Sequence, residues 1–280
     1  MSRGVLLFAS NNSSVNYVKQ ANFLAKRISK YMNLPTTLVT DVDVANKFPD
    51  YVVNFDEIIN VKSLKLQFAN KRYHDGSISN KVLPFNNGNR AAAYELSPYD
   101  ETLVMDTDFV ISNDILNNCF AQQKDLLLYK KAVHLGEYTE TSEFKHISDT
   151  SVDFYWATVF FFRKTPINKV FFDLINHIQE NYLHYRSVYQ FKSNVYRNDF
   201  AFSIAIHMMN GYQNGEFAAE LPGTHYYAID KDVLYSLEDD KFVVLVEKTD
   251  RFGEYTLNKL KGSNLHVMNK FSLERIIDNE

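Results

Sequence analysis

Two aspartates separated by one residue, Asp106 and Asp108, have the residue type and spacing to hold one metal ion. They stand between the apolar runs 102–105 and 109–111, so we expect them at the end of a buried strand, where uncompensated carboxylates are costly. Hard divalent cations prefer oxygen ligands and usually keep coordination positions for substrate phosphates. The pattern indicates either a divalent-cation site or turn carboxylates that local donors satisfy.

The same spacing occurs twice more, at Asp41 and Asp43 and at Asp230 and Asp232. The spacing alone is therefore a weak signal, because three such pairs are not expected to be three metal sites. The position between two apolar runs favours Asp106 and Asp108 as the metal-binding pair. For the other two pairs, turn or strand-end carboxylates are the favoured interpretation.

Strands and helices are expected to alternate around these aspartates. The apolar run 4–9, followed by a polar turn over 10–14, is typical of a buried parallel strand that opens into a loop. Helical spacing over 15–32 and β-branched residues over 36–40 complete a strand–helix–strand unit. Further strands are predicted over 55–61, 102–105, 155–163 and 241–246, and helices over 90–96, 169–183 and 200–209. The pattern predicts an α/β fold, a single Rossmann-like, mostly parallel sheet flanked by helices, with ligands at the carboxyl ends of its strands.

The composition is that of a folded protein of 280 residues, with 45% hydrophobic residues and a formal net charge of −4. This balance excludes a uniformly basic nucleic-acid-binding protein. The single cysteine, Cys119, excludes an internal disulfide and a cysteine-based zinc site, and favours a reducing compartment. Since no segment reads as a signal peptide or a membrane span, we expect a soluble cytoplasmic protein without a membrane partner.

Three common motifs are absent from the sequence. There is no G-x-G-x-x-G after the first predicted strand, no G-x-x-x-x-G-K-[ST] and no G-x-S-x-G. These absences argue against a dinucleotide-binding enzyme, a P-loop nucleotidase and an α/β-hydrolase.

The segment 89–111 resembles the part of GT-A glycosyltransferases in which a basic helix, a Pro-Tyr-Asp turn and a strand lead into an Asp-x-Asp motif. The similarity is closest to the glycogenin-like branch. It implies one GT-A domain over 1–280, with a nucleotide-sugar-binding half at 1–112 and an acceptor-binding half with a C-terminal elaboration at 113–280. The implied activity is transfer of a hexose or pentose from a nucleotide sugar, UDP-linked, with Mn²⁺ or Mg²⁺ as cofactor.

The resemblance also implies roles for individual residues. Asp106 and Asp108 would hold the metal together with His266, which opens a segment similar to the family's His-x-x-Gly-x-Lys, here His-x-x-x-Lys without the glycine. The residues implied in nucleotide-sugar binding are Ala9, Ser10, Asn11, Asp41, Asp43, Arg90, Thr107 and Lys270.

On the sugar side, Asp199 has two interpretations. It resembles the family's acidic residue beside the reacting sugar, and it also stands where an N-cap of the predicted helix 200–209 would be. Trp156 and Thr158 fall where the family commonly has Asn-x-Gly, so the sugar contacts of this chain differ. Trp156 either stacks on a sugar or base or packs in the core, and the neighbouring Phe-rich run favours the core.

Two stretches, 62–90 and 181–198, are basic despite the acidic total. In the second, Arg186, Lys192 and Arg197 alternate with aromatic residues, which suits either a phosphate backbone with stacked bases or a helix face with buried tyrosines. The style of the sequence is similar to bacteriophage glycosyltransferases, some of which modify hydroxymethylated pyrimidines in DNA. Modified DNA is therefore the leading acceptor hypothesis, which requires base flipping, with saccharide and protein acceptors left open.

Two other classes of function remain. A nucleotidyltransferase shares the α/β core and the cation, but it is expected to carry a Gly-rich basic turn after its first strand, which 10–14 lacks. A non-catalytic DNA- or glycan-binding module would keep the fold without turnover. The sequence leaves the sugar, the stereochemistry and the oligomeric state undecided.

Overall fold

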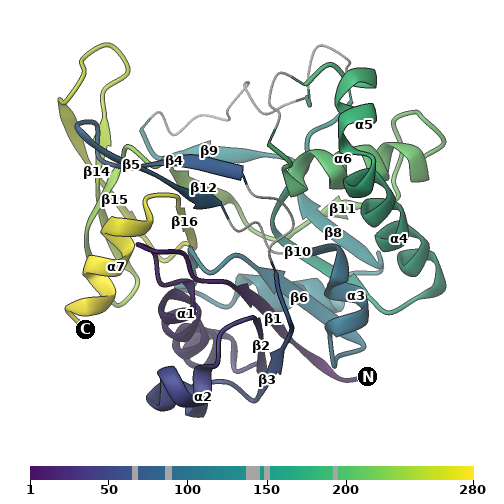
Figure 1. Cartoon of the computed structure of the whole chain (residues 1–280), viewed down its shortest axis with the longest axis horizontal. Coiled ribbons are helices and arrows are strands. Elements are labelled where there is room, and N and C mark those ends of the chain that lie inside the picture. The colour runs from purple at the N-terminus through teal and green to yellow at the C-terminus, as the bar shows by residue number, and fades with distance from the viewer. Residues whose placement is uncertain (65–68, 86–89, 137–145, 148–151, 192–194) are drawn as a thin grey trace.

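The computed structural model describes residues 1–64, 69–85, 90–136, 146–147, 152–191 and 195–280. Its centre is a seven-stranded sheet in the order β11-β8-β10-β6-β1-β2-β3 (Figure 1). Every pair in this sheet is parallel except those that β10 makes with β6 and β8. The strands are β1 (Arg3–Ala9), β2 (Thr36–Thr40), β3 (Glu57–Asn60), β6 (Glu101–Met105), β8 (Leu126–Tyr129), β10 (Trp156–Arg163) and β11 (Ala219–Glu220).

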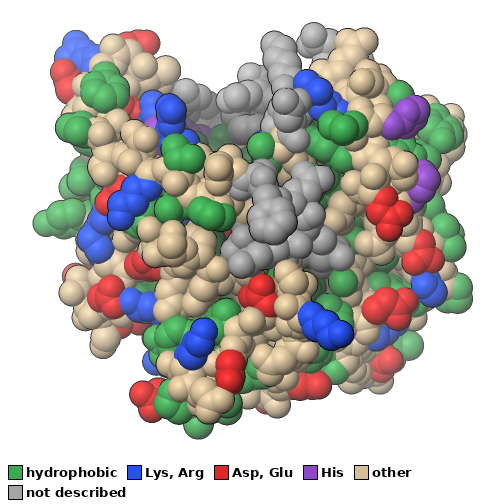
Figure 2. Space-filling model, in the orientation of Figure 1, with side chains coloured by type: hydrophobic (Ala, Val, Ile, Leu, Met, Phe, Trp, Pro, Cys, Tyr) green, Lys and Arg blue, Asp and Glu red, His purple; other side chains and the backbone are tan. Residues whose placement is uncertain are grey.

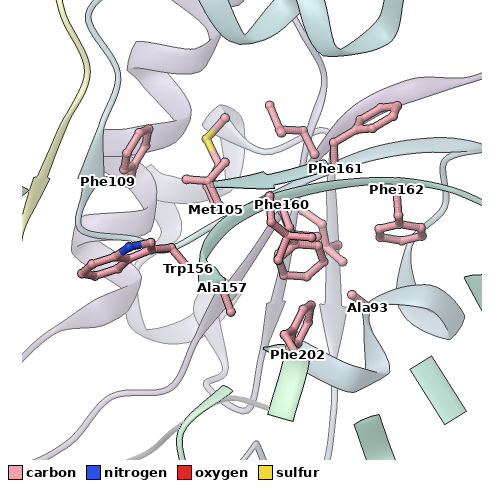
Figure 3. Close-up of a cluster of buried hydrophobic side chains, with 14 of the residues drawn as sticks. Ala93, Met105, Phe109, Trp156, Ala157, Phe160, Phe161, Phe162 and Phe202 are labelled. Atoms are coloured by element: carbon pink, nitrogen blue, oxygen red, sulfur yellow. The ribbon is translucent and has the colours of Figure 1, made fainter. Parts of the chain in front are cut away.

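Helices cover both faces of this sheet, as the sequence predicts. The aromatic side chains of β10 alternate between the faces: Phe160 packs on Phe202 of α6 at 4.8 Å between ring centroids, whereas Phe161 packs on Phe120 on the other side at 5.4 Å. Figure 3 shows this buried cluster around Phe160 and Phe202. The helices are α1 (Tyr17–Met32), α2 (Val44–Lys47), α3 (Ala93–Leu96), α4 (Pro166–Glu180), α5 (Tyr182–Val188), α6 (Asn198–Met209) and α7 (Lys270–Asp278), with 3₁₀ turns at Pro49–Asn54, Arg90–Ala92 and Ile115–Ala121.

The continuous apolar strands explain why the sheet was predictable. Val5, Leu6 and Leu7 of β1 have no exposed surface, and all five residues of β6 are buried. Strands that are covered on both faces carry such uninterrupted apolar runs. The predicted helix 169–183 is wrong in one respect, because Asn181 leaves the helical conformation and its side-chain amide donates to the His177 carbonyl at 2.9 Å, which separates α4 from α5.

A second, four-stranded sheet positions the C-terminal segment. Its order is β7-β16-β12-β9, with β7 at Phe109–Val110, β9 at Ala132–His134, β12 at His225–Ala228 and β16 at Leu265–Val267. Because β16 pairs antiparallel with β7, His266 lies opposite Phe109, the residue after Asp108. This pairing brings a histidine from the end of the chain to the Asp-x-Asp turn.

The remaining strands form a hairpin and a meander. The hairpin consists of β4 (Ala69–Asp75) and β5 (Ser79–Phe85), and it lies within the basic stretch 62–90, for which the sequence predicted no strand after 61. The meander consists of β13 (Val233–Glu238), β14 (Lys241–Glu247) and β15 (Tyr255–Lys261). The strand predicted over 241–246 therefore exists, but it belongs to this separate antiparallel sheet. In Figure 1 the hairpin lies close to β14, β15 and α7.

None of the described helices combines the length and the apolar composition that crossing a lipid bilayer requires.

Candidate active site

A cavity of about 450 Å³ opens where β1 and β6 end. Eleven of the residues singled out in the sequence line it, and they come from segments far apart in the chain. They are Ser10, Arg90, Asp106, Thr107, Asp108, Trp156, Thr158, Arg197, Asp199, His266 and Lys270. This volume is within the range of small-molecule sites, and its place at the carboxyl ends of parallel strands is the one expected for a ligand in such a fold.

The turn that carries the two aspartates is tied to strands on both sides. The Asp106 backbone N–H donates to the Thr158 carbonyl at 2.8 Å, which holds the turn to β10. The Asp108 carbonyl accepts from the Val267 N–H at 2.9 Å, which holds it to β16. The backbone is thus fixed at the point where the carboxylates enter the cavity.

Asp106, Asp108 and His266 form a group that could hold a metal ion. Each offers one ligand atom, and these atoms all lie within 4.8 Å of one another. His266 Nε2 lies 3.1 Å from Asp108 Oδ2, and both side chains are less than a tenth exposed. Two carboxylates and one imidazole fit Mn²⁺ well, whereas Mg²⁺ favours an all-oxygen set. The donor set therefore favours Mn²⁺ of the two predicted cations.

Each aspartate of the turn also has a basic partner. Arg90 pairs with Asp106, and Lys270 pairs with Asp108. Burial alone would raise the pKa of Asp108, but the charges of Lys270 and His266 outweigh it and hold that pKa well below its ordinary value. Asp108 is therefore an ionised, buried carboxylate whose partners are side chains. A metal cation could take the place of the Lys270 side chain beside it.

The predicted nucleoside-binding residues divide into two groups. Ser10 lines the cavity, and its Oγ donates to Asp41 Oδ2 at 2.9 Å, so these two lie together at the ends of β1 and β2. Asn11 instead accepts from a backbone N–H of α1 at 3.0 Å, Asp43 caps α2, and Ala9 is 1% exposed. These three have local structural roles in the structure.

Asp199 does not cap α6, so that interpretation of the sequence is wrong. The N-cap is Arg197, and Asp199 lies inside the first turn. Its Oδ1 accepts from the Ala157 N–H at 2.9 Å and its Oδ2 from Arg197 Nη2 at 2.8 Å. Because Arg90 Nη1 donates to the Ala157 carbonyl at 3.1 Å, one peptide segment of β10 orients both Asp199 and Arg90.

The aromatic residues near the cavity are mostly packed. Trp156 is 2% exposed and lies against Phe154 and His225, so the structure places it in the core although it contributes to the cavity wall. In the stretch 181–198, Tyr182, Tyr189, Phe191 and Tyr196 are buried, which agrees with the packing alternative for that stretch.

Of the three basic residues predicted to face an acceptor, one lies in the cavity. Arg197 lines it, whereas Arg186 is on α5, where its Nε donates to the Phe191 carbonyl at 3.1 Å. Lys192 lies outside the described residues. Figure 2 shows acidic and basic side chains interspersed over the described surface of this face, rather than the extended basic stripe that tracks a nucleic-acid backbone.

Sequence reasoning missed the contribution of the hairpin. Asn70, Lys71, Tyr73 and Phe85 from β4 and β5 line the cavity, together with Tyr17 of α1. The one available signal was the alternation of Lys71 and Tyr73, two residues apart, within a basic stretch.

No protein-family model matches the chain, and no curated protein matches it by sequence. Among solved structures it is similar to the glycosyltransferase GlyE of Streptococcus pneumoniae TIGR4, with 12% identity over 79% of this chain and a TM-score of 0.42. It spans 45% of the GlyE chain. It is also similar to the galactosyltransferase LgtC in complex with donor and acceptor sugar analogs (12% identity, 78% of this chain and 72% of that one, TM-score 0.46) and to mouse xyloside xylosyltransferase 1 (8% identity, 79% and 85%, TM-score 0.47).

Similarities at these identities and TM-scores do not assign an activity to this chain. The activity has to be argued from the side chains in the cavity. The glycogenin-like and bacteriophage resemblances stay predictions from the sequence.

Proposed function

We propose that the chain is a metal-dependent glycosyltransferase that moves a sugar from a nucleotide sugar, UDP-linked, to an acceptor hydroxyl. One observation carries this proposal: two carboxylates and a histidine within ligand reach of one another share a cavity with Arg90 and Lys270. A cation-binding group flanked by basic side chains suits a diphosphate leaving group.

The leaving group determines what these residues have to do. Negative charge develops on the diphosphate as its bond to the sugar breaks. Asp106, Asp108 and His266 would hold Mn²⁺ or Mg²⁺, which would supply Lewis-acid stabilisation of that charge. Arg90 and Lys270 border the same aspartates, so their side chains bind the phosphate oxygens from either side. The basic partners of the two aspartates are thus proposed to become partners of the substrate.

The nucleoside and the sugar are assigned to opposite sides of this group. Ser10 and Asp41 offer a hydroxyl and a carboxylate at the ends of β1 and β2, which suits the hydroxyls of a ribose or the N–H groups of a base. Asp199 and Thr158 line the side that β10 and α6 form, so they are proposed to contact the reacting sugar. Asp199 is already oriented by the Ala157 N–H and Arg197, which favours a fixed position beside a substrate.

The proposal is tested by incubating the protein with a panel of nucleotide sugars and Mn²⁺ and measuring slow hydrolysis of the donor. Hydrolysis of one donor, lost with chelator and in Asp108→Asn but kept in Asp173→Asn, is the expected result. Asp173 is 60% exposed and does not line the cavity, so its substitution is a matched control. Turnover of nucleoside triphosphates would favour a nucleotidyltransferase instead, and binding without any turnover would favour a non-catalytic module.

For the acceptor we propose a hydroxyl group, with a hydroxymethylated base in DNA as the hypothesis to test first. Arg197, a basic residue of the stretch 181–198, lines the cavity, where it can meet an acceptor phosphate. Mass spectrometry of hydroxymethylated and unmodified DNA, each treated with protein, donor and Mn²⁺, gives the test. A hexose or pentose increment on the modified DNA alone supports this acceptor, and its absence with an active donor directs the search to saccharides and proteins.

A further inference from the structure

The β4–β5 hairpin forms one wall of the cavity and brings a basic residue into it. Lys71 and Tyr73, two residues apart on β4, both line the cavity. Arg72 between them is exposed, as Lys71 also is, but of these two basic residues it is Lys71 that lines the cavity. Side chains of a strand alternate between its faces, so the hairpin directs one cation into the cavity and the next one away from it.

The hairpin is held in this position by contacts at its tip and along its length. Asp75 pairs with Arg275 of α7 through two hydrogen bonds of 2.7 and 2.8 Å. The Ser77 N–H donates to the Tyr255 hydroxyl of β15 at 2.8 Å, and Tyr73 and Tyr17 hydroxyls lie 3.2 Å apart. Three separate elements therefore fix the strand that carries Lys71.

The charged side chains that the structure describes in the cavity are paired, except for Lys71. Asp106 pairs with Arg90, Asp108 with Lys270, and Asp199 with Arg197. Among the described residues, Lys71 makes no ion pair, although it lines the same cavity. Its ammonium group lies over the rings of Tyr73 and Phe85, at 5.6 and 5.3 Å from their centroids.

Two like charges act on this unpaired ammonium group. Burial lowers the pKa of the Lys71 ammonium group most; the charges of Lys270 and Arg197 lower it further, and those of Asp230 and Asp108 raise it. A negative group bound among Lys71, Lys270 and Arg197 would relieve this repulsion. The position is therefore suited to an oxyanion.

We propose that Lys71 binds one oxyanion of the substrate that is not part of the diphosphate. The location of the diphosphate rests on the proposed function. In that proposal a divalent cation neutralises Asp106 and Asp108, so Arg90 and Lys270 no longer pair with these aspartates. Their two positive charges match the two negative charges of a sugar diphosphate. Lys71 is then the surplus charge, and its partner is a carboxylate on the transferred sugar or a phosphate on the acceptor.

The first experiment is a calorimetric titration of the metal-free protein with inorganic phosphate. Wild-type protein is expected to bind phosphate. Lys71→Met is expected to lower the phosphate affinity about tenfold, as the loss of one charge-assisted hydrogen bond does. Arg72→Met removes the same charge from the next residue and should stay within about twofold of the wild type. Lys71→Arg should keep most of the binding, and thermal unfolding of each variant checks that it folds.

The second experiment separates the two sources of the anion. Affinities for UDP-glucose and UDP-glucuronate with Mn²⁺ are compared in the wild type and in Lys71→Met. A preference of about tenfold for UDP-glucuronate that Lys71→Met abolishes assigns the anion to the sugar. No such preference, combined with phosphate binding to the UDP–Mn²⁺ complex that Lys71→Met removes, assigns it to the acceptor.

Three results would overturn the inference. The first is that the wild type does not bind phosphate, and the second is that wild type and Lys71→Met bind it equally. The third is that Lys71→Met loses as much affinity for UDP with Mn²⁺ as for phosphate, which would assign Lys71 to the diphosphate. If the wild type binds phosphate through Lys71 but does not bind UDP with Mn²⁺, the proposed function fails while the anion site at Lys71 stands.

Discussion

Two of the three Asp-x-Asp pairs, at Asp106 and Asp108 and at Asp230 and Asp232, differ in the partners of their second aspartate. Asp108 is buried in the cavity, and its side-chain partners are Lys270 and His266. Asp232 has a fully buried side chain and accepts from the backbone N–H groups of Ile229 and Glu247 at 2.8 and 3.0 Å. His134 Nε2 lies 3.0 Å from the same carboxylate.

The difference lies in the partners rather than in the spacing or the burial. Backbone N–H groups are fixed parts of the fold, so two of the three partners of Asp232 cannot move to another anion. Lysine and arginine side chains can move to another anion when a metal takes their place beside a carboxylate. The comparison indicates that an Asp-x-Asp pair is a candidate metal site when its partners are basic side chains in a cavity.

The largest effect that separates the two pairs is expected from Asp108→Asn. Removing this carboxylate from a buried metal-binding group should lower Mn²⁺ affinity by about a thousandfold or more. Electron paramagnetic resonance titration of free Mn²⁺ measures this. Asp232→Asn is the matched variant and should keep the wild-type affinity, and equal Mn²⁺ affinities in all three proteins would contradict the assignment.

The free energy of unfolding should be lowered more by Asp232→Asn than by Asp108→Asn, which is the opposite of their order for Mn²⁺ affinity. Asp232→Asn replaces an acceptor oxygen with an NH₂ group that cannot accept from a backbone N–H, so it should lower the free energy of unfolding by about 2–4 kcal/mol. Urea denaturation followed by circular dichroism gives the value. A stable Asp232→Asn protein with impaired Mn²⁺ binding would reverse the roles of the two pairs.

His266→Gln tests the third member of the metal-binding group. The loss of one imidazole ligand should weaken the binding of Mn²⁺ about 10- to 100-fold. The binding of Mg²⁺ should weaken less, because an imidazole contributes more to Mn²⁺ binding than to the binding of a cation that favours oxygen. The same Mn²⁺ titration applies, with the exposed His184→Gln as control. An equal loss for both cations would argue against direct ligation by His266.

The smallest effect is expected from the ion pair of Asp75 with Arg275, two residues that are not part of the cavity lining. The hydrogen bonds from Arg275 lower the pKa of Asp75 below 3.8, more than burial raises it. Since the folded pKa lies below the unfolded value, the pair stabilises the protein above pH 3.8 and loses this contribution as the pH falls through the folded pKa.

Arg275→Met should therefore lower the free energy of unfolding by about 0.5–1 kcal/mol at pH 6, in the range of solvent-exposed ion pairs. Below pH 3.8 the decrease should be smaller. Urea denaturation of wild type and variant at pH 6 and pH 3 measures the difference. A difference that grows with acid would contradict the assigned pair.

The sheet and the aspartate pair were predictable because local sequence determines them. The apolar strands β1, β6 and β10 are buried on both faces, so their sequences show it directly. The approach of His266 to Asp108, 158 residues away in the sequence, depends instead on the pairing of β16 with β7, and only the resemblance suggested it.

Two features could not be predicted from local patterns. The hairpin sequence from Ala69 to Asp75 is polar although three of its residues, Asn70, Lys71 and Tyr73, line the cavity, so it lacks the apolar alternation of a half-buried strand. Asp199 matches the N-cap pattern, but the helix begins at Asn198, two residues earlier than predicted, and the Asp199 carboxylate accepts from the Ala157 N–H of β10. Tertiary contacts decided both outcomes.

The most direct test of a metal–diphosphate site is a crystal structure with Mn²⁺ and UDP, in which anomalous scattering locates the manganese. We expect one manganese peak in contact with Asp106, Asp108 and His266, and a diphosphate beside Arg90 and Lys270. Bound UDP without manganese at these residues, or a manganese peak at Asp230 and Asp232 instead, would contradict it.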